Sequence, residues 1–156
     1  MKFKCVDELD KFSFSESEVR SCSSSTEYFK LELDGVIAKY NNPCNQRYQD
    51  FFIATTQVRF AYPQITKVFL EGRRIFDAND VLLEEIPDVE IMPEQYEEIF
   101  RKLKGGIVFM LQEQVDAAAG TRSFELAVDV GDDTYWIQTD FEKSIAEWDR
   151  FVAKVE

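Results

Sequence analysis

The stretch "TYWIQTDFEKSIAEWDRFVAKVE", Thr134 to Glu156, changes its apolar period halfway along. Its first half alternates apolar and polar residues, which predicts a strand. In its second half the apolar residues recur at steps of four and three, as along one side of a helix: Phe141, Ile145, Trp148, Val152 and Val155. Thr139 and Glu142 have the spacing of a capping box. The stretch therefore predicts a strand that leads into a C-terminal amphipathic helix.

The strand forms part of a predicted hairpin over Ser123 to Thr139. Four apolar residues share one face of its first strand: Phe124, Leu126, Val128 and Val130. Matching that face to Tyr135 and Ile137 requires a loop of two residues, Gly131-Asp132, or of four. Trp136 then points to the opposite face, where a helix, another sheet or a partner must cover it.

A second hairpin is predicted over Glu27 to Tyr40, where apolar residues alternate on both sides of Asp34-Gly35. This dipeptide favours a type I′ turn, because both turn positions need a positive φ. The resulting register gives one apolar face made of the facing pairs Leu33 with Val36, Leu31 with Ala38 and Phe29 with Tyr40.

The rest of the chain predicts further strands and one internal helix. β-Branched and aromatic residues favour strands within 47–62, 65–72 and 74–86, and the segment 12–25 is predicted to be an edge strand with a mobile end. Pro93 favours a helix start, and Gly105-Gly106 favours its end near Lys104. The predicted buried stripe of this helix is Tyr96, Ile99, Phe100 and Leu103.

The predicted end of the chain, with "YWIQTD" as strand and "FEKSIAEWDRFV" as helix, resembles that of pleckstrin-homology-like domains. In that family such a helix plugs one end of a β-barrel. The basic cluster that binds phosphoinositides there is missing, since Glu27, Glu32 and Asp34 stand around the first hairpin. The resemblance, over Tyr135 to Val155, implies a barrel scaffold used for protein contact and not for lipid headgroups.

The 156 residues suit a single globular domain, 1–156, with a net charge of -12. That charge repels phosphate backbones and anionic lipids, so nucleic-acid and membrane partners are not expected. It attracts a basic protein and accelerates the encounter. Alternatively, the acidic surface serves only to keep the protein soluble.

Three cysteines, Cys5, Cys22 and Cys44, form no C-x-x-C pair, and an odd number cannot pair completely within one chain. A reducing compartment is therefore expected, with Cys44 as a free, inert thiol. The charged start of the chain does not fit a secretory signal, and no apolar run approaches the length of a membrane span. These features predict a cytoplasmic protein.

Histidine is absent from the chain, which removes the commonest general base and metal ligand. The strong nucleotide-binding motifs are absent as well. Carboxylate pairs remain for a glycosidase or a divalent cation: Asp77 with Asp80, Glu84 with Glu85, and Asp132 with Asp133. We interpret these carboxylate pairs as parts of solvated turns. Arg73-Arg74 is expected to balance nearby carboxylates. We predict no metal and no cofactor.

Together these features predict an α+β domain: an antiparallel curved sheet or barrel with one internal helix and a C-terminal amphipathic helix. The predicted function is non-catalytic binding of a basic protein, as in inhibitor or immunity-type proteins. The expected partner-binding residues are Tyr28, Tyr96, Trp136, Asp132 and Asp133.

Two other functions stay open at this point. One is a small-molecule carrier with an aromatic-lined barrel, whose lining would be Phe29, Phe52, Phe60, Phe124 and Tyr135. The other is an enzyme that uses the carboxylates of Asp77, Asp80, Glu84 and Glu85.

Overall fold

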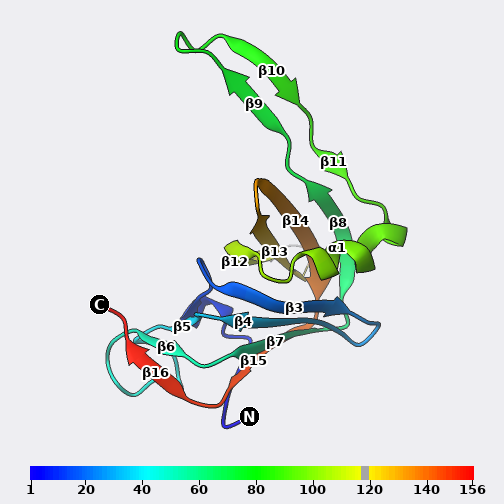
Figure 1. The fold of residues 1–156 in the computed structure, drawn as a ribbon. Coiled ribbons are helices and arrows are strands. Elements are labelled where there is room, and N and C mark those ends of the chain that lie inside the picture. Colours follow the sequence, from blue (N-terminus) through cyan, green and yellow to red (C-terminus); the bar gives the residue numbers. More distant parts are fainter. Residues whose placement is uncertain (117–119) are drawn as a thin grey trace.

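Antiparallel β-strands make up most of the computed structural model, which describes residues 1–116 and 120–156 (Figure 1). The strands are β1 (Phe3–Val6), β2 (Phe12–Ser13), β3 (Glu18–Ser24), β4 (Tyr28–Asp34), β5 (Ile37–Ala38), β6 (Phe51–Ile53), β7 (Thr56–Ala61), β8 (Gln64–Leu70), β9 (Arg73–Phe76), β10 (Leu82–Ile86), β11 (Val89–Glu90), β12 (Ile107–Asp116), β13 (Thr121–Val130), β14 (Asp133–Phe141), β15 (Lys143–Trp148) and β16 (Phe151–Lys154). The helical elements are 3-10 turns at Leu9–Lys11 and Pro93–Gln95 and the helix α1 (Tyr96–Lys102).

The described strands form three sheets. The largest has the order β1-β15-β7-β4-β3-β12-β13-β14-β8-β11, the second the order β16-β6-β5-β2, and β9 and β10 make the third by themselves. The large sheet starts at β1 and ends at β11 without joining them, so it is open. The prediction of an α+β fold with a possible barrel is therefore wrong. This is a mainly β fold with an open, curled sheet and a single short α-helix among the described residues.

The two halves of the large sheet meet through buried phenylalanine rings. The ring centroids of Phe60 on β7 and Phe124 on β13 lie 4.2 Å apart, and Phe29 on β4 lies 5.1 Å from Phe124. All three side chains are fully buried. Because the rings contact one another, side chains fill the space between the halves, as in the interiors of other proteins.

The predicted C-terminal helix is wrong, because its residues form β15 and β16. β15 pairs with β1 on one side and with β7 on the other. Trp148 is buried as the stripe requires, but Val152 is 53% exposed. Helix propensity is a weak preference, and here pairing with two distant strands overrides it. Tyr135 to Val155, which resemble the end of pleckstrin-homology-like domains, thus form the expected strand but not the expected helix. The resemblance itself stays a prediction.

The hairpin predicted over Ser123 to Thr139 is confirmed as β13 and β14. Leu126 pairs with Ile137 and Val128 with Tyr135, which leaves the two-residue loop Gly131-Asp132. Gly131 has a φ of 61°, at the first loop position where a type II′ turn places glycine.

The hairpin predicted over Glu27 to Tyr40 is wrong. β4 pairs with β3 and β7, whereas β5 pairs with β2 and β6 in another sheet. Gly35, with a φ of 85°, redirects the chain from one sheet to the other instead of closing a tight turn. The segment predicted as an edge strand contains β3, which lies inside the large sheet between β4 and β12.

The predicted internal helix begins at Pro93, as a 3-10 turn that continues into α1. Ile99, Phe100 and Leu103 of its stripe are buried, and Phe100 lies 5.5 Å from the ring of Phe29. Gly105 follows with a φ of 85°, as expected of a C-terminal cap. In the described ranges no helix is long and apolar enough to cross a membrane.

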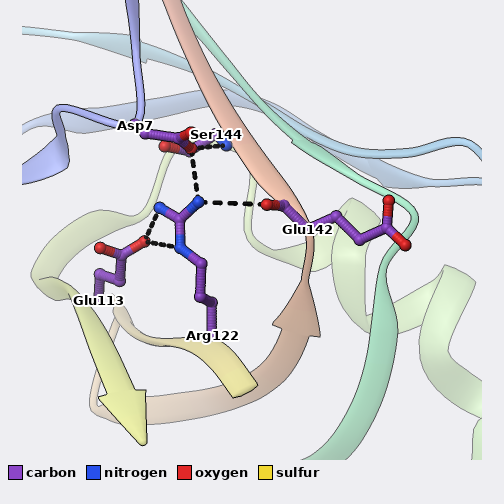
Figure 2. Close-up of polar contacts among 5 residues, drawn as sticks. All are labelled: Asp7, Glu113, Arg122, Glu142 and Ser144. Atoms are coloured by element: carbon purple, nitrogen blue, oxygen red, sulfur yellow. Dashed lines mark hydrogen bonds and ion pairs between the residues drawn. The ribbon is translucent and has the colours of Figure 1, made fainter. Parts of the chain in front are cut away.

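Arg122 of β13 joins four segments of the chain (Figure 2). Its guanidinium donates to the carboxylate of Glu113 on β12, to Asp7 Oδ1 at 2.8 Å and to the carbonyl oxygen of Glu142 at 3.1 Å. Asp7 Oδ1 also accepts the backbone N–H of Ser144 at 2.9 Å. Four of the five N–H groups of a guanidinium are thereby used, so Arg122 is a structural clamp with little capacity left for a ligand.

The clamp favours the ionised form of Asp7. Burial raises the pKa of this carboxyl, but the hydrogen bonds from Ser144 and Arg122 and the positive charge of Arg122 outweigh that effect and lower the pKa overall. A carboxyl whose pKa is lower in the folded state stabilises the fold above its unfolded pKa of about 3.9. That stabilisation is lost as the pH falls through the folded-state pKa.

We predict that Asp7→Asn lowers the free energy of unfolding by about 1 kcal/mol near pH 7, a value kept small because the Asp7 side chain is 41% exposed. The difference from the wild type should shrink below about pH 4, where the wild-type carboxyl becomes protonated. Urea unfolding across this pH range measures it. Asp10→Asn, at an exposed ion pair with Lys11, is the control and should change little. A difference that does not vary with pH would contradict the prediction.

Candidate docking site

A two-stranded arm projects away from the rest of the molecule (Figure 1). We define the arm as residues 73–86, which comprise β9, β10 and the turn between them. Among the described residues, β9 and β10 pair with each other and with no third strand. The arm extends the pair formed by β8 and β11 at the end of the large sheet, where Val89 faces Leu70. The large sheet therefore fixes the point from which the arm leaves.

The neck of the arm, Glu71-Gly72 and Pro87-Asp88, depends on glycine. Gly72 donates its N–H to Asp88 Oδ1 at 2.7 Å. A Cβ atom on Gly72 would lie 2.1 Å from the carbonyl oxygen of Ile86, which is too close for any side chain. The neck is therefore a tight backbone-to-backbone contact.

Arg73 ties the base of the arm to the loop between β13 and β14. Its Nη2 donates to the carbonyl oxygen of Asp132 at 2.5 Å and lies 3.5 Å from the carboxylate of Asp133. Two of the residues predicted to bind a partner thus lie where the arm joins the large sheet.

The tip of the arm is ordered by Asp77. Its Oδ1 accepts the N–H groups of Asn79 at 2.8 Å and Val81 at 3.0 Å, and Asp80 takes a φ of 62°. The Asp77 carboxylate therefore holds the turn. In residues 1–116 and 120–156, no group of three or more cysteine, aspartate or glutamate side chains is placed to hold a metal ion.

Apolar side chains of the arm lie in solvent. Six of them have 43% to 64% of their surface exposed: Ile75, Phe76, Val81, Leu82, Leu83 and Ile86. A two-stranded hairpin by itself is marginally stable in water, and large exposed apolar surfaces often mark sites of interaction. The arm is therefore a candidate docking site.

The arm and its neck are also acidic. Residues 71–90 contain seven acidic and two basic side chains. Arg74 forms an ion pair with Glu85 at 3.2 Å, and Arg73 is engaged by Asp133. Both local positive charges are thus already paired, and an excess of negative charge surrounds the exposed apolar groups.

Trp136 lies beside this region, on the face of β14 opposite to the core, as predicted. It pairs in register with Phe69 of β8, and the two rings stack with their centroids 6.1 Å apart and their planes 5° from parallel. The Trp136 Nε1 donor is buried and has no hydrogen-bond partner within residues 1–116 and 120–156. Phe69 therefore covers Trp136 in part, and an unused donor remains.

Tyr28 and Tyr96, the other two predicted residues, lie on other elements. Tyr28 on β4 has the guanidinium of Arg59 5.0 Å from its ring centroid, and Tyr96 on α1 stacks against Phe100 at 5.9 Å. Burial, followed by the charges of Glu90 and Glu94, raises the pKa of the Tyr96 phenol. The structure thus brings Trp136, Asp132 and Asp133 close to the base of the arm, but Tyr28 and Tyr96 make their contacts elsewhere.

No protein-family model, curated protein or solved structure was found to match the chain. The β-branched and aromatic residues of 74–86 predict strands but do not predict that their apolar side chains are exposed. One feature of the sequence does indicate this exposure: apolar and charged residues mix on both faces of the predicted strands, so neither face is suited to a core.

We predict that Gly72→Ala loosens the arm without unfolding the large sheet. The added methyl group must displace the neck, so amides of β9 and β10 should exchange with deuterium roughly tenfold faster or more. Hydrogen exchange read by mass spectrometry measures this, with β13 and β14 as the internal reference. Unchanged exchange in the arm would contradict the role given to Gly72.

Proposed function

We propose that the protein is a non-catalytic docking module that binds a basic protein through its arm. The observation that carries this proposal is the exposure of six apolar side chains on a hairpin whose strands pair only with each other within the described residues. Burying those side chains against a partner supplies binding free energy that the free protein lacks.

The charge of the region selects the partner. An acidic rim around apolar anchors attracts a basic surface, accelerates the encounter and sets the orientation. A second copy of the chain suits this rim poorly, because each copy has a net charge of -12 and their acidic arms would repel. The outer edges of β9 and β10 pair with no other strand in the part of the chain that the structure describes, so they offer backbone groups to a partner's extended segment.

The predicted inhibitor or immunity-type role is one form of this function. A narrow acidic hairpin on a broad body has the shape to enter a basic cleft while the body blocks its mouth, and Asp132, Asp133 and Trp136 adjoin the base of the arm. Packing among the rings of Phe29, Phe60 and Phe124 gives no support to the alternative of a small-molecule carrier.

The test compares two double variants of the immobilised protein in an extract of its source cells. Phe76→Ser with Leu83→Ser removes two arm side chains that are 52% and 64% exposed. Phe109→Ser with Val152→Ser removes two that are 60% and 53% exposed outside the arm, and it is the matched control. Loss of central apolar anchors should weaken the retained complex by at least about tenfold, and the control should not.

The retained protein is then purified and titrated calorimetrically against each variant at two salt concentrations. A basic partner whose affinity depends on the arm and falls with added salt supports the proposal. Equal loss of affinity in both double variants would show that the arm is not the docking element, and an acidic partner would contradict the proposed selection by charge.

A further inference from the structure

Two cysteines distant in sequence lie side by side. Cys5 is buried in β1, and Cys44 is half-buried in the loop between β5 and β6. Their Sγ atoms are 3.7 Å apart. Because a disulfide bond is about 2.05 Å long, bonding requires the two sulfur atoms to approach by roughly 1.7 Å.

The loop holds Cys44 in this position through Asn42. The Asn42 side chain is buried and accepts the Cys44 N–H at 2.9 Å and the Cys5 thiol at 3.4 Å. Its own amide group donates to the carbonyl oxygen of Lys11 at 3.1 Å. One side chain therefore contacts both cysteines and anchors the loop to the start of the chain.

Asn45 fixes the other side of the loop. It is buried, and its side-chain amide donates to the carbonyl oxygens of Ala38, Lys39 and Gln49 at 2.9 to 3.2 Å. Asn42 and Asn45 thus hold the backbone on both sides of Cys44. The loop is already ordered with Cys44 beside Cys5, so forming the bond does not require ordering the loop.

We propose that Cys5 and Cys44 form a reversible disulfide bond when the protein meets a low-molecular-weight disulfide such as glutathione disulfide. This bond goes beyond the docking function and does not depend on it. It replaces the expectation that Cys44 is an inert thiol.

The exchange begins at Cys44, which is the more exposed of the two. After its proton passes to solvent, the Cys44 thiolate attacks one sulfur of glutathione disulfide, which forms a mixed disulfide and releases a glutathione thiolate. Cys5 then attacks Cys44 Sγ, gives up its proton to solvent and expels the second glutathione thiolate. The two released thiolates take up the two protons. Two protein thiols are oxidised, and one glutathione disulfide is reduced to two thiols.

Burial explains this order of events. Burial, followed by the adjacent Cys44, raises the pKa of the Cys5 thiol to about 12. Cys5 is therefore protonated at neutral pH and unreactive toward a reagent in solution, and it acts only on a sulfur already beside it. Burial likewise raises the pKa of Cys22, for which no neighbouring thiol exists among the described residues.

The bond would tie an edge of the large sheet to the small one. β1 is the terminal strand of the large sheet, and the Cys44 loop leads into β6 of the four-stranded sheet. Cross-linking positions this far apart restricts the unfolded chain, so the oxidised protein should melt roughly 5–15 °C higher than the reduced one.

The test equilibrates the purified chain with glutathione and glutathione disulfide at graded ratios, blocks free thiols and maps peptides without reduction. The expected product has lost two hydrogen atoms, contains a cross-link between Cys5 and Cys44, and reverts on addition of dithiothreitol. Cys22→Ser should behave as the wild type, and Cys44→Ser should show no loss of mass.

Three results would overturn the proposal: a stable glutathione adduct at Cys44 without a cross-link, a cross-link between two copies of the chain, or thiols that stay reduced at every ratio. Peptide mapping of the wild-type chain distinguishes these outcomes, so the test does not depend on whether a cysteine variant folds.

Discussion

The contact between Phe60 and Phe124 is the interaction on which the rest of the structure depends. It joins β7 and β13, which belong to opposite halves of the open sheet. An open sheet buries both halves only if it curls onto itself, and these fully buried rings hold the curl. The curl also sets the positions of β8 and β14 at the far end of the sheet, from which the arm leaves.

Apolar side chains are usually buried, but those of the arm are exposed. The backbone of the arm is held at the neck by the contact that Gly72 permits. In the proposed docking function, the contact at the neck would reduce the conformational entropy that is lost when a partner covers the arm. The same proposal assigns the choice of a basic partner to the acidic groups around the arm.

Local sequence signals predicted the elements that local interactions determine. The hairpin at Gly131-Asp132 and the helix start at Pro93 are confirmed, because a turn or cap decides each. The terminal helix and the hairpin at Asp34-Gly35 are wrong, because distant strands decide their pairing. The partner-binding roles of Trp136, Asp132 and Asp133 stay predictions. The exposure of the arm and the proximity of Cys5 to Cys44 are tertiary properties that no local pattern contains.

The most direct test of the central claim is photo-crosslinking in the source cells, with a photoreactive amino acid placed at Leu83 of the arm or at Phe109 on β12. The two positions are 64% and 60% exposed, so they sample solvent similarly. The proposed docking function predicts that Leu83 captures one basic protein that Phe109 does not capture. The same capture pattern at both positions, or no protein captured at Leu83, would contradict it.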